Sequence, residues 1–259
     1  MGPKLRIGCA QYTARHGDAQ NNLSTIEQLV IAAAKDAVEL LVLPEMAVTG
    51  YAKPEIIVAA AEPIPGPTSN QLGAFAIQHD VAIAAGLVEK DPTTGLMHNT
   101  MLLLDRNGIE VLRYRKVHLW DTETGWAAPG TSFPVAKIYE VKVGMWICYD
   151  TRFPESARSL AKNGAQLALV STAWLGPADE WELALRSRAM DNGIFVAGSA
   201  QLGRSFYGVS MIIDPHGRIM AQGDPLKDMI ISADVELDEI AKFHQRVPLL
   251  KHLQPDSYR

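Results

Sequence analysis

Cysteine is scarce in this chain, since only Cys9 and Cys148 occur among its 259 residues. Two cysteines cannot build the disulfide framework of a small secreted protein or a four-thiolate zinc site. The histidines are scattered without metal-ligand spacing, and no glycine-rich phosphate loop ending in Gly-Lys-Ser/Thr occurs. We therefore expect no metal, no cofactor, and a reducing, cytoplasmic location.

Excess positive charge and long apolar runs are also absent. Lys and Arg number 24 against 29 Asp and Glu, a net charge of −5, which argues against a nucleic-acid partner. The longest apolar runs are 81–88 and 39–48, far short of the about 20 residues of a membrane-spanning helix. The first residues lack the apolar core of a signal peptide. We expect no membrane partner.

Short apolar strands alternate with amphipathic helices along the chain. Leu5 to Ala10 is typical of a buried strand, and Asn21 and Asn22 indicate the start of a helix that runs to about Ala37. Asn107-Gly108 between two apolar runs indicates a hairpin. No Ser/Gly-rich linker or low-complexity stretch interrupts the pattern. The predicted fold is α/β, a two-sheet α-β-β-α sandwich, with a single domain over residues 1–259.

Cys148 has the position of a nucleophile. It follows the apolar strand Lys142 to Ile147 and precedes a helix that starts at Pro154. Such a strand-to-helix turn exposes the side chain at the edge of the sheet, and the next backbone N–H, that of Tyr149, can point at a developing oxyanion. Cys9 lies within a strand, so we expect it to be buried and inert.

A thiol is a weak nucleophile at neutral pH unless a base or a cation activates it. No histidine lies in a familiar Cys/His signature. Glu45 follows the apolar strand 41–43, where partial desolvation raises a carboxyl pKa towards that of a general base. Lys116 ends a second strand-like segment. Taken alone, Glu45 is more typical of a solvated loop and Lys116 of surface charge.

Together these environments resemble a family. Pro44-Glu45, the segment Arg115 to Leu119 and the segment Cys148 to Glu155 resemble, in order and separation, the nitrilase superfamily of carbon–nitrogen hydrolases. The resemblance covers essentially the whole chain. Further matches are Gly50-Tyr51, Pro65-Gly66-Pro67, Asn99-Thr100, Pro129-Gly130, Arg186 to Asn192 and Asp214 to Gly217.

The resemblance implies roles for individual residues. Cys148 would attack an amide carbon, and Glu45 would take the thiol proton and later activate water to hydrolyse the thioester. Lys116 would face the oxyanion together with the Tyr149 N–H. Glu123 would orient Lys116 or the substrate amide.

Other implied roles are less specific. Asp121 is the alternative to Glu123. Tyr51 and Trp174 are candidate substrate-binding residues, although aromatic core contacts would explain them equally well. Members of this superfamily form dimers or larger assemblies, with the helix Pro154 to Lys162 as the candidate surface here.

The residues around Cys148 favour an amidase. Tyr149-Asp150 resembles the amidases, whereas true nitrilases tend to have Trp-Glu there. Carbamoyl amino acid hydrolases tend to have two arginines where this chain has Thr151 and Arg152, so we expect Arg152 to be a structural ion-pair partner. Segment 176–182 resembles the ω-amidases, which cleave monoamides of dicarboxylic acids. Arg204 would either meet a substrate carboxylate or be solvated.

The sequence therefore predicts an enzyme that hydrolyses a small carboxamide to a carboxylic acid and ammonia. An N-carbamoyl amino acid hydrolase and a nitrilase remain open. Two other classes also remain open: an acyltransferase that uses the same thioester, and a non-catalytic oligomeric scaffold.

Overall fold

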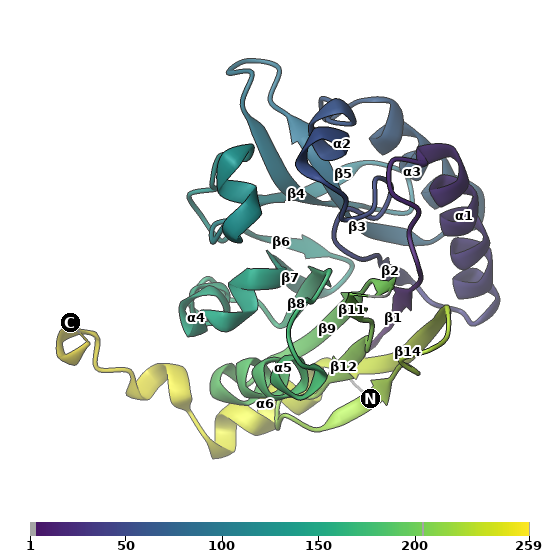
Figure 1. Cartoon of the computed structure of the whole chain (residues 1–259). Helices are drawn as coiled ribbons and strands as arrows, with labels where there is room; N and C mark the ends of the chain where they lie inside the picture. The colour runs from purple at the N-terminus through teal and green to yellow at the C-terminus, as the bar shows by residue number, and fades with distance from the viewer. Residues whose placement is uncertain (1–3, 204, 259) are drawn as a thin grey trace.

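Two six-stranded sheets form the centre of the molecule (Figure 1). The computed structural model describes residues 4–203 and 205–258. The first sheet has the order β14 (Met229–Glu236), β1 (Lys4–Gln11), β2 (Leu40–Val42), β3 (Ala82–Lys90), β4 (Met97–Leu104), β5 (Glu110–Arg115). The second has the order β13 (Ile219–Gln222), β12 (Met211–Ile213), β9 (Phe195–Ala200), β8 (Leu167–Thr172), β7 (Val141–Ile147), β6 (Val135–Ile138). A small ribbon pairs β10 (Leu202–Gly203) with β11 (Phe206–Tyr207).

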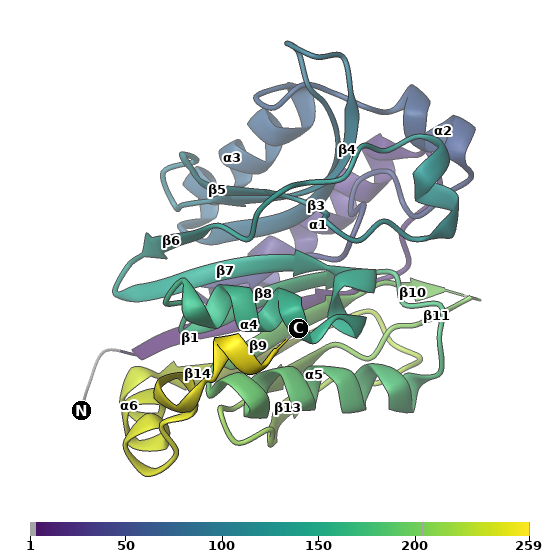
Figure 2. The same cartoon turned by 90° about the vertical axis from the view of Figure 1, so that its left-hand side faces the viewer.

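Helices cover the outer faces of both sheets, as Figure 2 shows. On the first sheet lie α1 (Ala19–Lys35) and α3 (Pro67–His79), and on the second α4 (Pro154–Lys162) and α5 (Ala178–Asn192). The remaining helices and turns are α2 (Pro54–Ala59), α6 (Leu237–Arg246), η1 (Asp121–Gly125), η2 (Cys148–Arg152), η3 (Leu249–His252) and η4 (Pro255–Ser257). The predicted α-β-β-α sandwich is confirmed. Within the described ranges, no helix combines the length and apolarity needed to cross a membrane.

The strand β2 shows why the sequence reads as an uninterrupted apolar run. Leu40 and Val42 pack into the core between the sheets, whereas Leu41 packs against the helices outside. Because both faces of a central parallel strand are buried, every position is apolar. Cys9 is buried in the same core, as expected, and burial raises the pKa of its thiol.

The topology brings distant loops to one edge of the sandwich. Strands β1, β2 and β3 are parallel to one another, as are β7, β8 and β9. β5 runs in the same direction as β3, because both are antiparallel to β4. Loops that follow parallel strands leave a sheet at the same edge, where α/β proteins bind ligands. Glu45, Lys116 and Cys148 each come shortly after such a strand.

Candidate active site

Cys148 lies at a sharp turn directly after β7. Its φ of +44° falls in the left-handed region that side chains other than glycine's seldom adopt. Asp150 fixes the turn from below, since its Oδ2 accepts hydrogen bonds from the Ile147 N–H at 3.0 Å and the Tyr114 hydroxyl at 2.6 Å. The predicted strand-to-helix turn is therefore present, with Cys148 half-buried. Helix α4 begins at Pro154, one short 3₁₀ turn later.

A buried charged cluster lies beside this thiol. The Lys116 Nζ is 3.0 Å from Glu45 Oε1 and 2.7 Å from Glu123 Oε2, and all three side chains are completely buried. The Asn99 Nδ2 donates to Glu45 Oε1 at 2.7 Å and to Glu123 Oε1 at 2.6 Å. The structure thus brings the predicted Glu45, Lys116, Glu123 and Cys148 together. The bridging role of Asn99 was missed, because its sequence signal was only a family match.

Both sheets hold Glu45 in place. Its Oε2 accepts a hydrogen bond at 2.9 Å from the backbone N–H of Ala173, which follows β8 in the second sheet. Its carbonyl accepts one from Gln201 Nε2 at 2.5 Å. Beneath it, a Cβ on Gly86 would lie 2.6 Å from the Glu45 Cα, so only glycine lets β3 approach so closely. The carboxylate therefore has a fixed orientation.

The electrostatics of the cluster set the protonation states. Burial opposes the Lys116 ammonium, yet Glu45, Cys148 and Glu123 outweigh it and hold the Lys116 pKa well above its usual value. Burial raises the pKa of Glu123 despite Lys116. Burial and then Glu45 raise the pKa of Cys148, which Lys116 only partly offsets. The resting thiol is thus neutral, and a base must take its proton during attack.

An aromatic pocket of about 110 Å³ opens in front of Cys148. Its lining residues are Tyr51, Trp120, Cys148, Tyr149, Arg152, Ala173, Trp174, Leu175 and Gly176. Both candidate substrate-binding residues, Tyr51 and Trp174, are thus among its walls. Burial, followed by the charge of Glu45, raises the pKa of Tyr51, so its phenol stays neutral.

The structure places two of the remaining candidates, Asp121 and Arg152, outside the charged cluster beside Cys148. Asp121 is exposed on η1, whereas Glu123 in the same turn is buried and bonded to Lys116, so the alternative is not needed. Arg152 forms the expected ion pair, with Nη2 2.5 Å from Glu180 Oε2. Arg204 lies outside the described residues. No group of three or more His, Cys, Asp or Glu in the described part of the chain is arranged as metal ligands.

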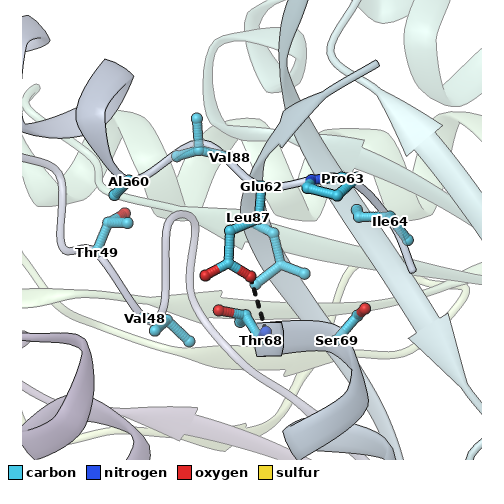
Figure 3. A pocket seen from close by; sticks show the side chains of 10 residues that line it. All are labelled: Val48, Thr49, Ala60, Glu62, Pro63, Ile64, Thr68, Ser69, Leu87 and Val88. Carbon is cyan, nitrogen blue, oxygen red and sulfur yellow. Dashed lines mark hydrogen bonds between the residues drawn. The ribbon is translucent and has the colours of Figure 1, made fainter. Parts of the chain in front are cut away.

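A second, smaller cavity lies behind the loop that follows β2 (Figure 3). It measures about 20 Å³, room for one water molecule. The Glu62 carboxylate in its wall accepts a hydrogen bond from the Thr68 N–H at 2.8 Å, and the Thr49 hydroxyl is buried without a described partner. None of the predicted site residues lines it. Among these two cavities, only the pocket in front of Cys148 is lined by predicted site residues.

Thr172, the last residue of β8, is a site residue that sequence reasoning missed. Its hydroxyl acts on the Cys148 thiol and lowers the thiol pKa, against the larger effect of burial. The Thr172 side chain is completely buried, and no hydrogen-bond partner for its Oγ1 is found among the described residues, so its effect on the thiol is one of proximity. Only the packing of β8 beside β7 reveals this contact.

Replacing Thr172 by valine is expected to slow alkylation of Cys148 by iodoacetamide about 2–10-fold at neutral pH, because a hydroxyl near the sulfur stabilises the thiolate by no more than one neutral hydrogen bond would. The measurement is the alkylation rate against pH, which should shift to higher pH. Thr172→Ser should restore the native alkylation rate and its pH dependence. Ser171→Ala is the matched control, because that buried, unpaired hydroxyl points to the opposite face of the strand. An equal shift in the control would contradict the assignment.

Comparison with known proteins identifies the family. The family model described as carbon-nitrogen hydrolase matches residues 6–245. The chain belongs to this carbon-nitrogen hydrolase family, and the resemblance to the nitrilase superfamily is confirmed.

Named relatives cover the whole length of the chain. A probable nitrilase of Schizosaccharomyces pombe is 32% identical over 99% of this chain and 98% of its own. A 2-oxoglutaramate amidase of Bacillus subtilis is 32% identical over 98% of this chain and 100% of its own. A mutant of the amidase from Nesterenkonia sp. AN1, solved with acrylamide added to its active-site cysteine, is 28% identical. Its TM-score is 0.82, over 93% of this chain and 99% of that one.

Proposed function

We propose that this protein hydrolyses the carbon–nitrogen bond of a small primary carboxamide, giving a carboxylate and ammonia through a thioester on Cys148. The observation that carries the proposal is a neutral thiol at a strained turn beside the buried pair of Glu45 and Lys116. The amidase names of relatives similar over nearly their full length support the reaction class.

Acylation begins when the Cys148 sulfur attacks the amide carbon while Glu45 accepts the thiol proton. Negative charge develops on the carbonyl oxygen, where the Lys116 ammonium and the Tyr149 N–H stabilise it. Glu45 then gives the proton to the leaving nitrogen, the C–N bond breaks, and ammonia departs. A single carboxylate thus serves as base and then as acid.

Deacylation repeats this cycle with water. The oxygen of a water molecule attacks the thioester carbon while Glu45 takes a proton from that water, and the C–S bond breaks. The proton returns to the sulfur, so the thiol is regenerated and the acid is released. Glu123 keeps Lys116 in place through both steps, since the two side chains are 2.7 Å apart.

The test is ammonia release by the purified protein on four substrate classes: short aliphatic amides, dicarboxylic acid monoamides, carbamoyl amino acids and nitriles. Hydrolysis of amides, with an acyl-enzyme mass on Cys148, supports the proposal. Turnover confined to carbamoyl amino acids or nitriles would move the protein to that branch. Amide consumption that yields hydroxamate with hydroxylamine and no acid would indicate an acyltransferase. A folded protein with no turnover would favour a scaffold.

We further propose that copies of this chain pair, as a dimer or larger assembly, through the face formed by α4 and α5. These helices lie side by side on the second sheet (Figure 2). Leu183 and Met190 of α5 support this surface, since they are 68% and 50% exposed. Light scattering that gives the mass of one chain would contradict the proposal.

The proposed location is the cytoplasm, because a free catalytic thiol persists in a reducing compartment. The two cysteines are both free in the structure. Detection of the native protein in a secreted or membrane fraction would contradict this location. The single domain over residues 1–259 also stays a proposal, which limited proteolysis tests.

A further inference from the structure

We propose that the ion pair of Arg152 and Glu180 makes the pocket rim neutral, so that the enzyme selects amides whose acyl group is uncharged and apolar. This inference rests on the proposed function and narrows its substrate class. It concerns the rim of the pocket and leaves the chemistry at Cys148 unchanged.

Arg152 is the only charged side chain among the described residues that line the pocket. A free arginine there would be a natural partner for a second substrate carboxylate. This one is already engaged, because its Nη2 lies 2.5 Å from Glu180 Oε2. Its guanidinium also lies over the Trp174 ring, 4.6 Å from the ring centroid. The positive charge at the rim is therefore compensated before any substrate arrives.

The local backbone is shaped around this pair. A Cβ on Gly176 would lie 2.9 Å from Arg152 Nη2 and 3.0 Å from Trp174 Nε1, so the absence of a side chain there leaves room for the guanidinium. Glu180 lies in the first turn of α5, where the helix dipole favours a negative charge. Both partners are thus held, and Glu180 keeps the Arg152 guanidinium of the pocket wall paired.

The buried charged cluster beside Cys148 adds no net positive charge to the pocket. Glu45, Lys116 and Glu123 sum to −1 when both carboxylates are ionised, and to zero when one holds a proton. The walls are apolar, formed by Tyr51, Trp120, Trp174 and Leu175. Burying one methylene group against such walls corresponds to about a fourfold gain in binding affinity. Uncharged acyl chains therefore gain from this pocket, whereas a second carboxylate loses water without gaining a free cation among the residues that the structure describes.

The test compares butyramide with succinamate, in which a carboxylate replaces the terminal methyl group. The native enzyme is expected to favour butyramide in kcat/KM by about tenfold or more. Glu180→Gln removes the negative charge and frees Arg152, which should raise the succinamate-to-butyramide ratio about three- to tenfold at this solvent-exposed rim. Glu182→Gln is the matched control, because Glu182 lies on the same helix but pairs with Arg186 at 2.9 Å. It should leave the ratio unchanged.

The inference would be overturned, with the proposed function intact, by a native enzyme that hydrolyses succinamate faster than butyramide, or by a Glu180→Gln ratio equal to that of the native enzyme. A ratio that rises equally in the Glu182→Gln control would also count against it, since the effect would then be one of net charge. Absence of hydrolysis with every amide would instead overturn the proposed function, and the inference with it.

Discussion

Replacement of Cys148 by alanine is expected to lower kcat/KM for amides by about 10⁵–10⁶-fold, the scale of losing a covalent nucleophile. Without the sulfur no thioester forms, while the walls of the pocket keep their shape and still bind substrate. The measurement is ammonia release together with the mass of the protein after mixing with substrate. The variant should show neither ammonia nor an acyl adduct.

Cys9→Ala is the matched control for this experiment. Cys9 is the other thiol of the chain, and it is buried in the core between the sheets, away from the pocket. This variant should retain its turnover and its acyl adduct, apart from a loss of stability caused by the missing sulfur. Ammonia release that survives in Cys148→Ala would remove Cys148 from the mechanism.

Replacement of Glu45 by glutamine is expected to lower turnover by about 10²–10⁴-fold, the usual range for a general acid–base group. Glutamine keeps the volume of the side chain but can neither take the thiol proton nor activate water. Both acylation and deacylation should slow, because the same carboxylate serves in each. Rapid mixing with an amide, followed by mass spectrometry, measures the two rates separately.

Glu62→Gln provides the comparison for that variant. Glu62 lines the smaller cavity behind the β2 loop and contacts none of the reactive residues. Its variant should turn over at close to the native rate. Near-native rates for both steps in Glu45→Gln would show that the base is another group.

The fold could be predicted where the signal is local. The Asn107-Gly108 turn forms the expected hairpin between β4 and β5, with Gly108 at a φ of +72°. The start of α1 could not be predicted. The expected start at Asn21 and Asn22 is wrong, because Asp18 caps the helix with its side chain, which accepts a hydrogen bond from the Asn21 N–H at 3.3 Å. The Asn22 side chain lies inside the helix and donates to the carbonyls of Arg15 and Val48. The contact with Val48 joins segments far apart in the sequence, which local preferences do not register.

The residues of the candidate site also fall into those that motifs predict and those that depend on packing. Glu45, Lys116, Glu123 and Cys148 follow motifs that can be read along the chain. Residues whose contribution depends on how strands and sheets pack could not be found in this way: the Asn99 bridge, the Thr172 hydroxyl and the Ala173 N–H. Their residue types alone do not indicate a function, and only the position in space gives them a role.

The hydrogen bond from the Ala173 N–H to Glu45 spans the seam between the two sheets, as does the bond from the Tyr114 hydroxyl to Asp150. Glu45, the proposed base, therefore also helps to hold the two sheets together. A substitution of Glu45 would lower both the stability of the fold and the catalytic rate. Residues at the rim do not hold the sheets together, because Leu175 and the pair of Arg152 and Glu180 lie partly in solvent. New substrate preferences in this scaffold should therefore arise at the rim, with the seam left intact.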